Sequence, residues 1–301
     1  MDKGTRTDRR KLIQGMGMGI GIAVLAAGDT ARATDPGTAQ GTLKVNSTMV
    51  ALTHAVAFRK DNAEGVLDNP ELRIAVTDRE IASDLLADLI PERLETLARD
   101  GKVRGLLWKL DARTPKQALQ GTLLLPPGKP AESLIFFTRS NTAGIFERFE
   151  IANNRVIGDA KHASEAKAEV AGYDYAISFT APLLQDGKVT ARPAGPLAVR
   201  HPAAQAYLGF QRALRTGDLE AARRFASPER IRQVHALRRQ LGEAAFRQQV
   251  KQFVPEEAGL VRTLRQVVVR TNVAVVVLQD RPDAPRSGET LRLVSGVWKL
   301  Q

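Results

Sequence analysis

The chain has no cysteine among its 301 residues. This absence excludes disulfide bonds, thiolate nucleophiles, iron–sulfur clusters and cysteine-ligated zinc. A chain of this length can bury a core large enough to be stable without covalent cross-links. The sequence therefore predicts a fold that depends on its hydrophobic core, even in an oxidising compartment.

Aromatic residues are scarce as well, at 5% of the chain. Sugar- and base-binding surfaces depend on stacked aromatic rings, so this composition argues against both. The apolar share of 43% and the charged share of 26% are ordinary for a globular protein. We therefore expect a folded chain without a stacking surface.

Histidine is rare, and its spacing does not fit a metal site. The four histidines are His54, His162, His201 and His235, and no two of them have His-x-His, His-x-x-x-His or HExxH spacing. The chain also lacks the Gly-x-Ser-x-Gly nucleophile elbow and the Gly-Lys-Ser/Thr phosphate loop. We therefore predict no metal and no cofactor.

The amino terminus has the layout of a secretory signal peptide. Five of the first eleven residues are basic, the stretch 12–28 is weakly apolar, and Ala31-Arg32-Ala33 offers the small residues that signal peptidase reads. The apolar stretch is shorter than the roughly 20 residues that a membrane span needs, and it is rich in glycine. We predict cleavage after Ala33, which leaves no stable membrane span.

The segment Asp8-Arg9-Arg10-Lys11-Leu12-Ile13-Gln14 resembles the bacterial twin-arginine consensus. It departs from that consensus in having Asp for Ser, Leu for Phe and Gln for Lys. The resemblance implies that the twin-arginine export machinery recognises Arg9 and Arg10. It also implies that the mature protein is periplasmic.

Residues 34–184 are predicted to form a β-rich, sandwich-like domain, because short apolar or alternating runs are separated by turn-forming residues. Evenly spaced strands of this kind suggest a sandwich or a barrel. One helical stripe interrupts the runs at 78–97, and Pro91 marks a kink or a break within it. The runs are 42–45, 53–58, 72–76, 103–110, 119–125, 134–139, 144–151 and 173–180.

Residues 185–201 contain two prolines and two glycines without a period, and they are predicted to be a linker. From residue 202 to residue 301 the pattern is helices followed by strands. Gly217 is the expected stop of the first helix, Asp218 the cap of the second, and Ser227 the cap of the third. We therefore predict an α+β domain here.

The run Phe210-x-x-Ala213-Leu214-x-x-Gly217-Asp218-x-Glu220-Ala221-Ala222-x-x-Phe225 and the closing hairpin 294–300 carry a family resemblance. They resemble the cone-shaped α+β superfamily of nuclear transport factor 2, ketosteroid isomerase and the SnoaL-like proteins. Members of that superfamily include isomerases, hydrolases and pure binding modules. The resemblance covers residues 202–301 and implies a cavity under the helices, without implying one activity.

Catalytic members of the superfamily transfer protons with an Asp–His or Asp–Tyr pair. Here Tyr207, Asp218 and His235 are the candidates that the helices offer. The strands add no base, because no Asp or Glu occurs between Leu260 and Leu278. We therefore predict that proton-transfer catalysis is the lesser alternative.

Positive charge is concentrated in residues 200–301, which hold 18 basic and 9 acidic residues, whereas residues 34–199 hold 20 and 21. This excess can serve solubility alone, or it can bind an anionic partner such as a lipid head group, a lipopolysaccharide phosphate or an acidic polysaccharide. Nucleic acid is not expected in the periplasm. The candidate binding residues are Arg212, Arg215, Arg223, Arg224, Arg238 and Arg239.

The sequence thus predicts an exported two-domain protein with a β-rich domain and a cone-fold α+β domain. Its predicted role is non-catalytic binding of a small ligand or of an anionic component of the cell envelope. The alternative is a small-molecule enzyme of the isomerase or hydrolase type that uses the cavity of the carboxy-terminal domain.

Overall fold

The computed structural model describes residues 36–89, 91–115, 118–125, 135–138, 145–164 and 172–301. The predicted signal peptide, with Arg9, Arg10 and the cleavage site after Ala33, lies outside these residues. The described chain divides into two compact units. We call residues 36–62 and 68–186 the N-terminal unit, and residues 63–67 and 187–301 the C-terminal unit.

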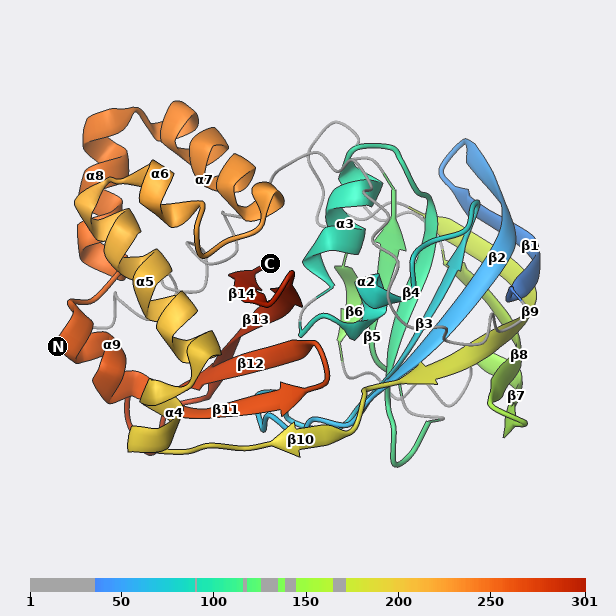
Figure 1. The fold of residues 1–301 in the computed structure, drawn as a ribbon. Helices are drawn as coiled ribbons and strands as arrows, with labels where there is room; N and C mark the ends of the chain where they lie inside the picture. The colour runs from blue at the N-terminus through green and yellow to red at the C-terminus, as the bar shows by residue number, and fades with distance from the viewer. Residues whose placement is uncertain (1–35, 90, 116–117, 126–134, 139–144, 165–171) are drawn as a thin grey trace, which may run out of the picture. The chain divides into compact units, whose positions relative to one another are not determined.

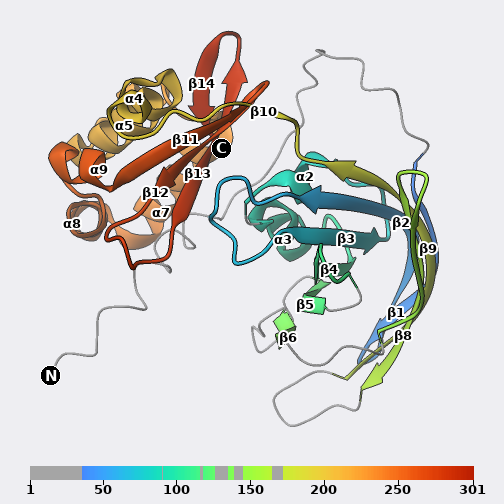
Figure 2. The same ribbon diagram turned by 90° about the horizontal axis from the view of Figure 1, so that it is seen from below.

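The N-terminal unit is built on one curled antiparallel sheet of nine strands (Figures 1 and 2). The strand order is β6-β5-β4-β3-β2-β1-β9-β8-β7. The strands are β1 (Thr38–Val45), β2 (Thr48–Lys60), β3 (Glu71–Thr77), β4 (Gly105–Asp111), β5 (Ala118–Leu124), β6 (Ile135–Thr138), β7 (Phe146–Ala152), β8 (Arg155–Ser164) and β9 (Tyr173–Gln185).

A single sheet replaces the two packed sheets that the sandwich-like prediction implied. Strands β2 and β9 are each 13 residues long, whereas β1 between them has eight. Where β1 is absent, β2 and β9 pair directly in parallel at Ala57↔Leu183. The chain therefore keeps its strands in one continuous ladder that curls.

Both faces of this sheet are buried over its centre. Alternate residues of β4 belong to two different clusters: Trp108 packs on one side of the sheet, and Leu107 packs on the other, against α2 (Asp84–Ala87) and α3 (Glu92–Arg99). Trp108 is fully buried, and its ring centroid lies 5.3 Å from that of Phe146. Several of the chain's few aromatic residues are therefore used in this core.

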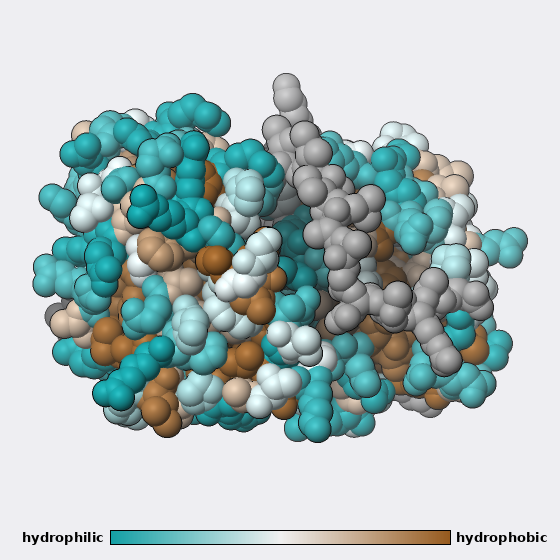
Figure 3. Space-filling view, viewed as in Figure 1, coloured by the Kyte–Doolittle hydropathy of each residue, from teal (hydrophilic) through white to brown (hydrophobic). Residues whose placement is uncertain are grey.

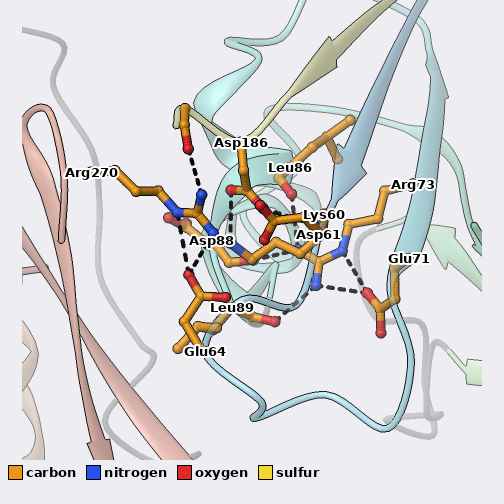
Figure 4. Close-up of polar contacts among 11 residues, drawn as sticks. Lys60, Asp61, Glu64, Glu71, Arg73, Leu86, Asp88, Leu89, Asp186 and Arg270 are labelled. Atoms are coloured by element: carbon orange, nitrogen blue, oxygen red, sulfur yellow. Dashed lines mark hydrogen bonds and ion pairs between the residues drawn. The ribbon is translucent and has the colours of Figure 1, made fainter. Parts of the chain in front are cut away.

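The helical stripe predicted at 78–97 is two short helices, α2 and α3, with the break at the predicted Pro91. Arg73 holds the connection between them. Its guanidinium is 1% exposed and donates hydrogen bonds to the carbonyl oxygens of Leu86 and Leu89, and it pairs with Glu71 at 2.7 Å (Figure 4). A buried arginine thus fixes this helix pair to β3.

The C-terminal unit has a five-stranded antiparallel sheet in the order β10-β11-β12-β13-β14, with helices packed against one face (Figure 1). Its strands are β10 (Val189–Ala191), β11 (Leu264–Arg270), β12 (Val273–Leu278), β13 (Ser287–Val294) and β14 (Val297–Leu300). Its helices are α4 (Pro196–Arg200), α5 (Pro202–Thr216), α6 (Leu219–Ala222), α7 (Pro228–Leu241), α8 (Glu243–Phe253) and α9 (Glu257–Thr263). The described chain is therefore α+β, as predicted.

The helix boundaries follow local chemistry. Gly217 ends α5 in the left-handed region at φ 75°, and Ser227 caps α7 by accepting a hydrogen bond from the backbone N–H of Arg230 at 3.2 Å. His201 caps α5 by accepting from Ala203 N–H, which the sequence analysis did not anticipate.

The stretch expected to be a linker, 185–201, contains regular structure. It holds β10 and α4, and Pro193 and Gly195 bond through their backbone to the region of β11. Of the described residues that precede 187, the five residues 63–67 join the C-terminal unit.

Candidate functional site

The structure does not assemble the three side chains proposed for proton transfer. Asp218 accepts a hydrogen bond from Ala221 N–H at 2.9 Å, so it is the cap of α6. Tyr207 is buried on α5, and His235 is half-buried on α7. Among the described residues, no hydrogen bond or ion pair joins any two of the three.

Tyr207 instead belongs to a buried polar group that the sequence analysis missed. The groups that act on its hydroxyl include Gln211 one turn along α5, Arg230 on α7 and Glu289 on β13. The guanidinium of Arg230 is 10% exposed and lies 3.5 Å from the Glu289 carboxylate. Burial, and then the Glu289 charge, raise the pKa of Tyr207 well above its ordinary value. Tyr207 is therefore a neutral hydrogen-bonding residue at physiological pH and not a base.

Apart from this polar group, the side chains packed between the helices and the five-stranded sheet are mostly apolar. Phe210 and Val234 from the helices, and Val267 and Val276 from the strands, are all fully buried in one cluster. A cavity that binds a small ligand needs a few hundred Å³ of open volume lined by convergent polar groups. In the described residues, packed apolar side chains therefore occupy much of the place where the family resemblance implied a cavity.

The six candidate arginines fall into separate places. Arg223 pairs with Glu220 at 3.4 Å along α6, and Arg238 pairs with Glu243 at the junction of α7 and α8. Arg224 and Arg239 are exposed, and within the described part of the chain neither has a carboxylate partner. Only Arg212 and Arg215 share one recess of the surface.

This recess, which we call the α5–α9 hollow, has a volume of about 220 Å³. Apolar side chains line it beside the two arginines, and two of them, Leu208 and Leu260, are almost fully buried. The complete lining is Leu208, Arg212, Arg215, Thr216, Pro255, Glu256, Glu257 and Leu260. The hollow thus combines an apolar surface with two guanidinium groups.

Two glutamates hold the guanidinium groups in place. Arg212 Nε donates to Glu257 Oε2 at 3.1 Å, and this hydrogen bond lowers the pKa of Glu257 and raises that of Arg212. Arg215 donates to the Val254 carbonyl oxygen at 2.6 Å and to Glu256 Oε1 at 3.2 Å. The side chain of Glu256 is 82% exposed, so an incoming anion can displace it at little cost.

A second hollow lies in the N-terminal unit, with a volume of about 520 Å³. Its polar lining is Arg59, Asn153, Asn154 and Gln185, and the two asparagines form the β7–β8 turn at positive φ. This second hollow has one cationic side chain in its lining, whereas the α5–α9 hollow has two. We therefore take the α5–α9 hollow as the candidate site.

The remaining histidines are explained by local structure. His201 caps α5, and burial lowers its pKa. His162 stacks on Tyr173 with ring centroids 4.8 Å apart, and His54 bonds with Thr53 on β2. No group of three His, Cys, Asp or Glu side chains placed to hold a metal occurs in the described ranges.

Two further observations concern the surface of the molecule and its helices. The face of the C-terminal unit seen in Figure 3 is mostly hydrophilic, with hydrophobic atoms scattered between polar side chains. Within the residues that the structure describes, no helix has the length and apolar character to cross a bilayer.

Comparisons with known protein families, curated protein sequences and solved structures find no match to this chain.

Proposed function

We propose that the mature chain is an exported, non-catalytic binding protein whose C-terminal unit binds an anionic group of the cell envelope in the α5–α9 hollow. The observation that carries this proposal is the pairing of Arg212 and Arg215 beside apolar side chains in one recess. Guanidinium groups bind phosphate and carboxylate through paired hydrogen bonds.

Charge supports the same proposal. Six of the nine acidic side chains in residues 200–301 already pair with arginines of that region, and these pairs occupy seven of its eighteen basic residues. The excess positive charge therefore remains after internal pairing and attracts anions over about a Debye length, roughly 10 Å at moderate salt. An anionic phospholipid, with its phosphate beside acyl chains, matches the combined apolar and cationic lining.

Vesicle binding tests this proposal. Residues 34–301 are mixed with vesicles of phosphatidylcholine, with and without phosphatidylglycerol, and the bound fraction is measured by co-sedimentation at several salt concentrations. We expect binding only to the anionic vesicles, and weakening as salt rises. The Arg212→Gln/Arg215→Gln variant should lose roughly tenfold or more in affinity, since each surface cation contributes about 1 kcal/mol.

The matched control is Arg223→Gln/Arg232→Gln. These two arginines are also exposed, and each pairs with a glutamate of its own helix region, so the variant loses the same charge outside the hollow. Equal losses in the two variants would show that charge alone acts, without a site. Absence of binding to anionic vesicles would contradict the proposal as a whole.

A further inference from the structure

Arg270 lies at the end of β11 on the sheet face that turns away from the helices. Val267 and Val269 of the same strand point into the helix-covered core, and Val268 and Arg270 alternate with them. Although they lie on the other face, Val268 is 1% exposed and Arg270 is 5% exposed. The face of an antiparallel sheet that carries no helices is commonly solvated. At Val268 and Arg270 this second face is therefore covered by other parts of the chain.

Two contacts of Arg270 come from distant places in the chain. Its Nη2 lies 3.0 Å from Oε1 of Glu64, whose side chain is 0% exposed, and its Nη1 donates to the carbonyl oxygen of Gly187 (Figure 4). Gln266, which lies four residues before Arg270 on β11, donates a hydrogen bond from its side chain to the Glu64 carbonyl oxygen at 3.1 Å. Glu64 and Gly187 lie next to the points where the chain enters the C-terminal unit.

The backbone of the segment 63–67 is also fitted to this unit. Gly65 has φ 65°, a left-handed conformation that a residue with a side chain adopts with strain. A Cβ atom at this position would lie 3.0 Å from Nη1 of Arg286, which is the far end of a flexible side chain, so the backbone angle and not crowding favours glycine here. The segment therefore has both a specific ion pair and a specific backbone shape.

We propose that residues 63–67 are an obligatory part of the C-terminal fold, fastened by Arg270, and that residues 187–301 alone are an incomplete domain. The buried guanidinium and the buried carboxylate stabilise each other, because removal of one partner takes the nearest opposite charge away from the other in a poorly solvated place. The C-terminal unit thus acquires its last structural element from the β2–β3 connection of the chain.

The two tryptophans of the chain allow a direct test, since Trp108 belongs to the N-terminal unit and Trp298 to the C-terminal unit. In residues 34–301, Trp108→Phe leaves Trp298 as the reporter, and Trp298→Phe leaves Trp108. Urea unfolding is followed by fluorescence in each background, with and without Glu64→Gln. We expect Glu64→Gln to lower the midpoint reported by Trp298 by roughly 1 M or more.

The control is Lys60→Gln. Lys60 pairs with Asp186 at 2.9 Å inside the N-terminal unit, with both side chains at least nine-tenths buried, so the variant breaks a similar pair only four residues away. It should lower the Trp108 midpoint more than the Trp298 midpoint. For Glu64→Gln, a Trp298 shift at least as large as the Trp108 shift supports the proposal. An unchanged Trp298 midpoint, or a larger shift of Trp108, overturns it.

A second measurement covers the case in which a tryptophan substitution prevents folding. Hydrogen exchange of residues 34–301 with both tryptophans present, read by mass spectrometry, should show that Glu64→Gln reduces protection of β11 and β12. Adding Arg270→Met to Glu64→Gln should restore part of that protection, because the buried charge that lost the Glu64 carboxylate is then removed as well. Unchanged protection of both strands in Glu64→Gln overturns the proposal.

Discussion

At the scale of single residues, Asp218 shows how one side chain fits two hypotheses that the structure separates. Its place after Gly217 suited a helix cap, and its chemistry suited a catalytic acid. The carboxylate accepts from Ala221 N–H at 2.9 Å, and it is exposed to solvent. Capping explains its position without any substrate.

Substitution of Asp218 tests the capping role. Asp218→Ala should lower the free energy of unfolding by about 1 kcal/mol, because one N–H at the start of α6 loses its acceptor. Asp218→Ser should retain most of the stability, since a serine hydroxyl caps equally well. Both are measured by urea unfolding of residues 34–301. Equal stability of the alanine variant and the unsubstituted chain would rule out the cap.

Residues whose roles are local were predictable, and residues whose partners are distant were not. Gly217 and Ser227 act within a few positions of their own places, so their types alone indicated their roles. Glu64 and Arg270 are 206 positions apart, and nothing in either neighbourhood marks them as a pair. The same is true of Arg230 and Glu289, whose charges act on Tyr207.

At the scale of elements, the strand and helix predictions were most accurate where periodicity was strong. The break at Pro91 and the long helix after Ser227 are both present. Strand β8 was missed because Asp159 and Lys161 interrupt its apolar pattern. Gly158 on that strand lies so close to Phe179 that an added Cβ would be 2.6 Å from the ring. The residue types of β8 are therefore set by its neighbours in the sheet.

Asp78 joins two elements of the N-terminal unit, the end of β3 and the start of β4. Oδ1 accepts from Arg104 N–H and Oδ2 accepts from Arg104 Nε, each at 2.9 Å. Burial favours a higher pKa for Asp78, but these hydrogen bonds and the nearby Arg79 charge together hold it below its ordinary value. The carboxylate therefore stabilises the fold in its ionised form.

The pH dependence follows from this lowered pKa. The stabilisation is complete above the unfolded-state pKa, near 4, and is lost as the pH falls through the lower pKa of the folded state. Asp78→Asn should cost about 2 kcal/mol at pH 7, and less as the pH falls below about 4. Unfolding is measured at both pH values, with Glu80→Gln as the control at an exposed neighbour. A cost that stays constant with pH would contradict this assignment.

At the scale of the whole molecule, the α+β class followed from the sequence, whereas the assembly of the strands did not. Alternating runs indicate strands but leave their pairing open, and a sandwich and a single curled sheet use the same patterns. The long β2 and β9, which pair beyond the end of β1, decide the outcome. The contribution of residues 63–67 to the C-terminal unit could not be predicted either, because the sequence pattern does not show which distant segments pack together.

The predicted export of the chain through the twin-arginine route can be tested independently of its fold. Arg9→Lys/Arg10→Lys keeps the charge of the leader but removes the paired arginines, and it should abolish export in a bacterial host while Arg6→Lys leaves export intact. The measurement is the distribution of uncleaved and cleaved chain between cytoplasm and periplasm. Export of the double variant at the normal level would show that the chain uses another route.

The pairing of Glu64 with Arg270 also sets an order of events during synthesis. Glu64 leaves the ribosome long before Arg270 has been translated, since ribosomes add roughly 5–20 residues per second from the N-terminus. Residues 63–67 therefore cannot form their contacts with β11 until that strand has been synthesised. This contact therefore cannot form until the chain is nearly finished, a timing that suits a protein expected to cross a membrane already folded.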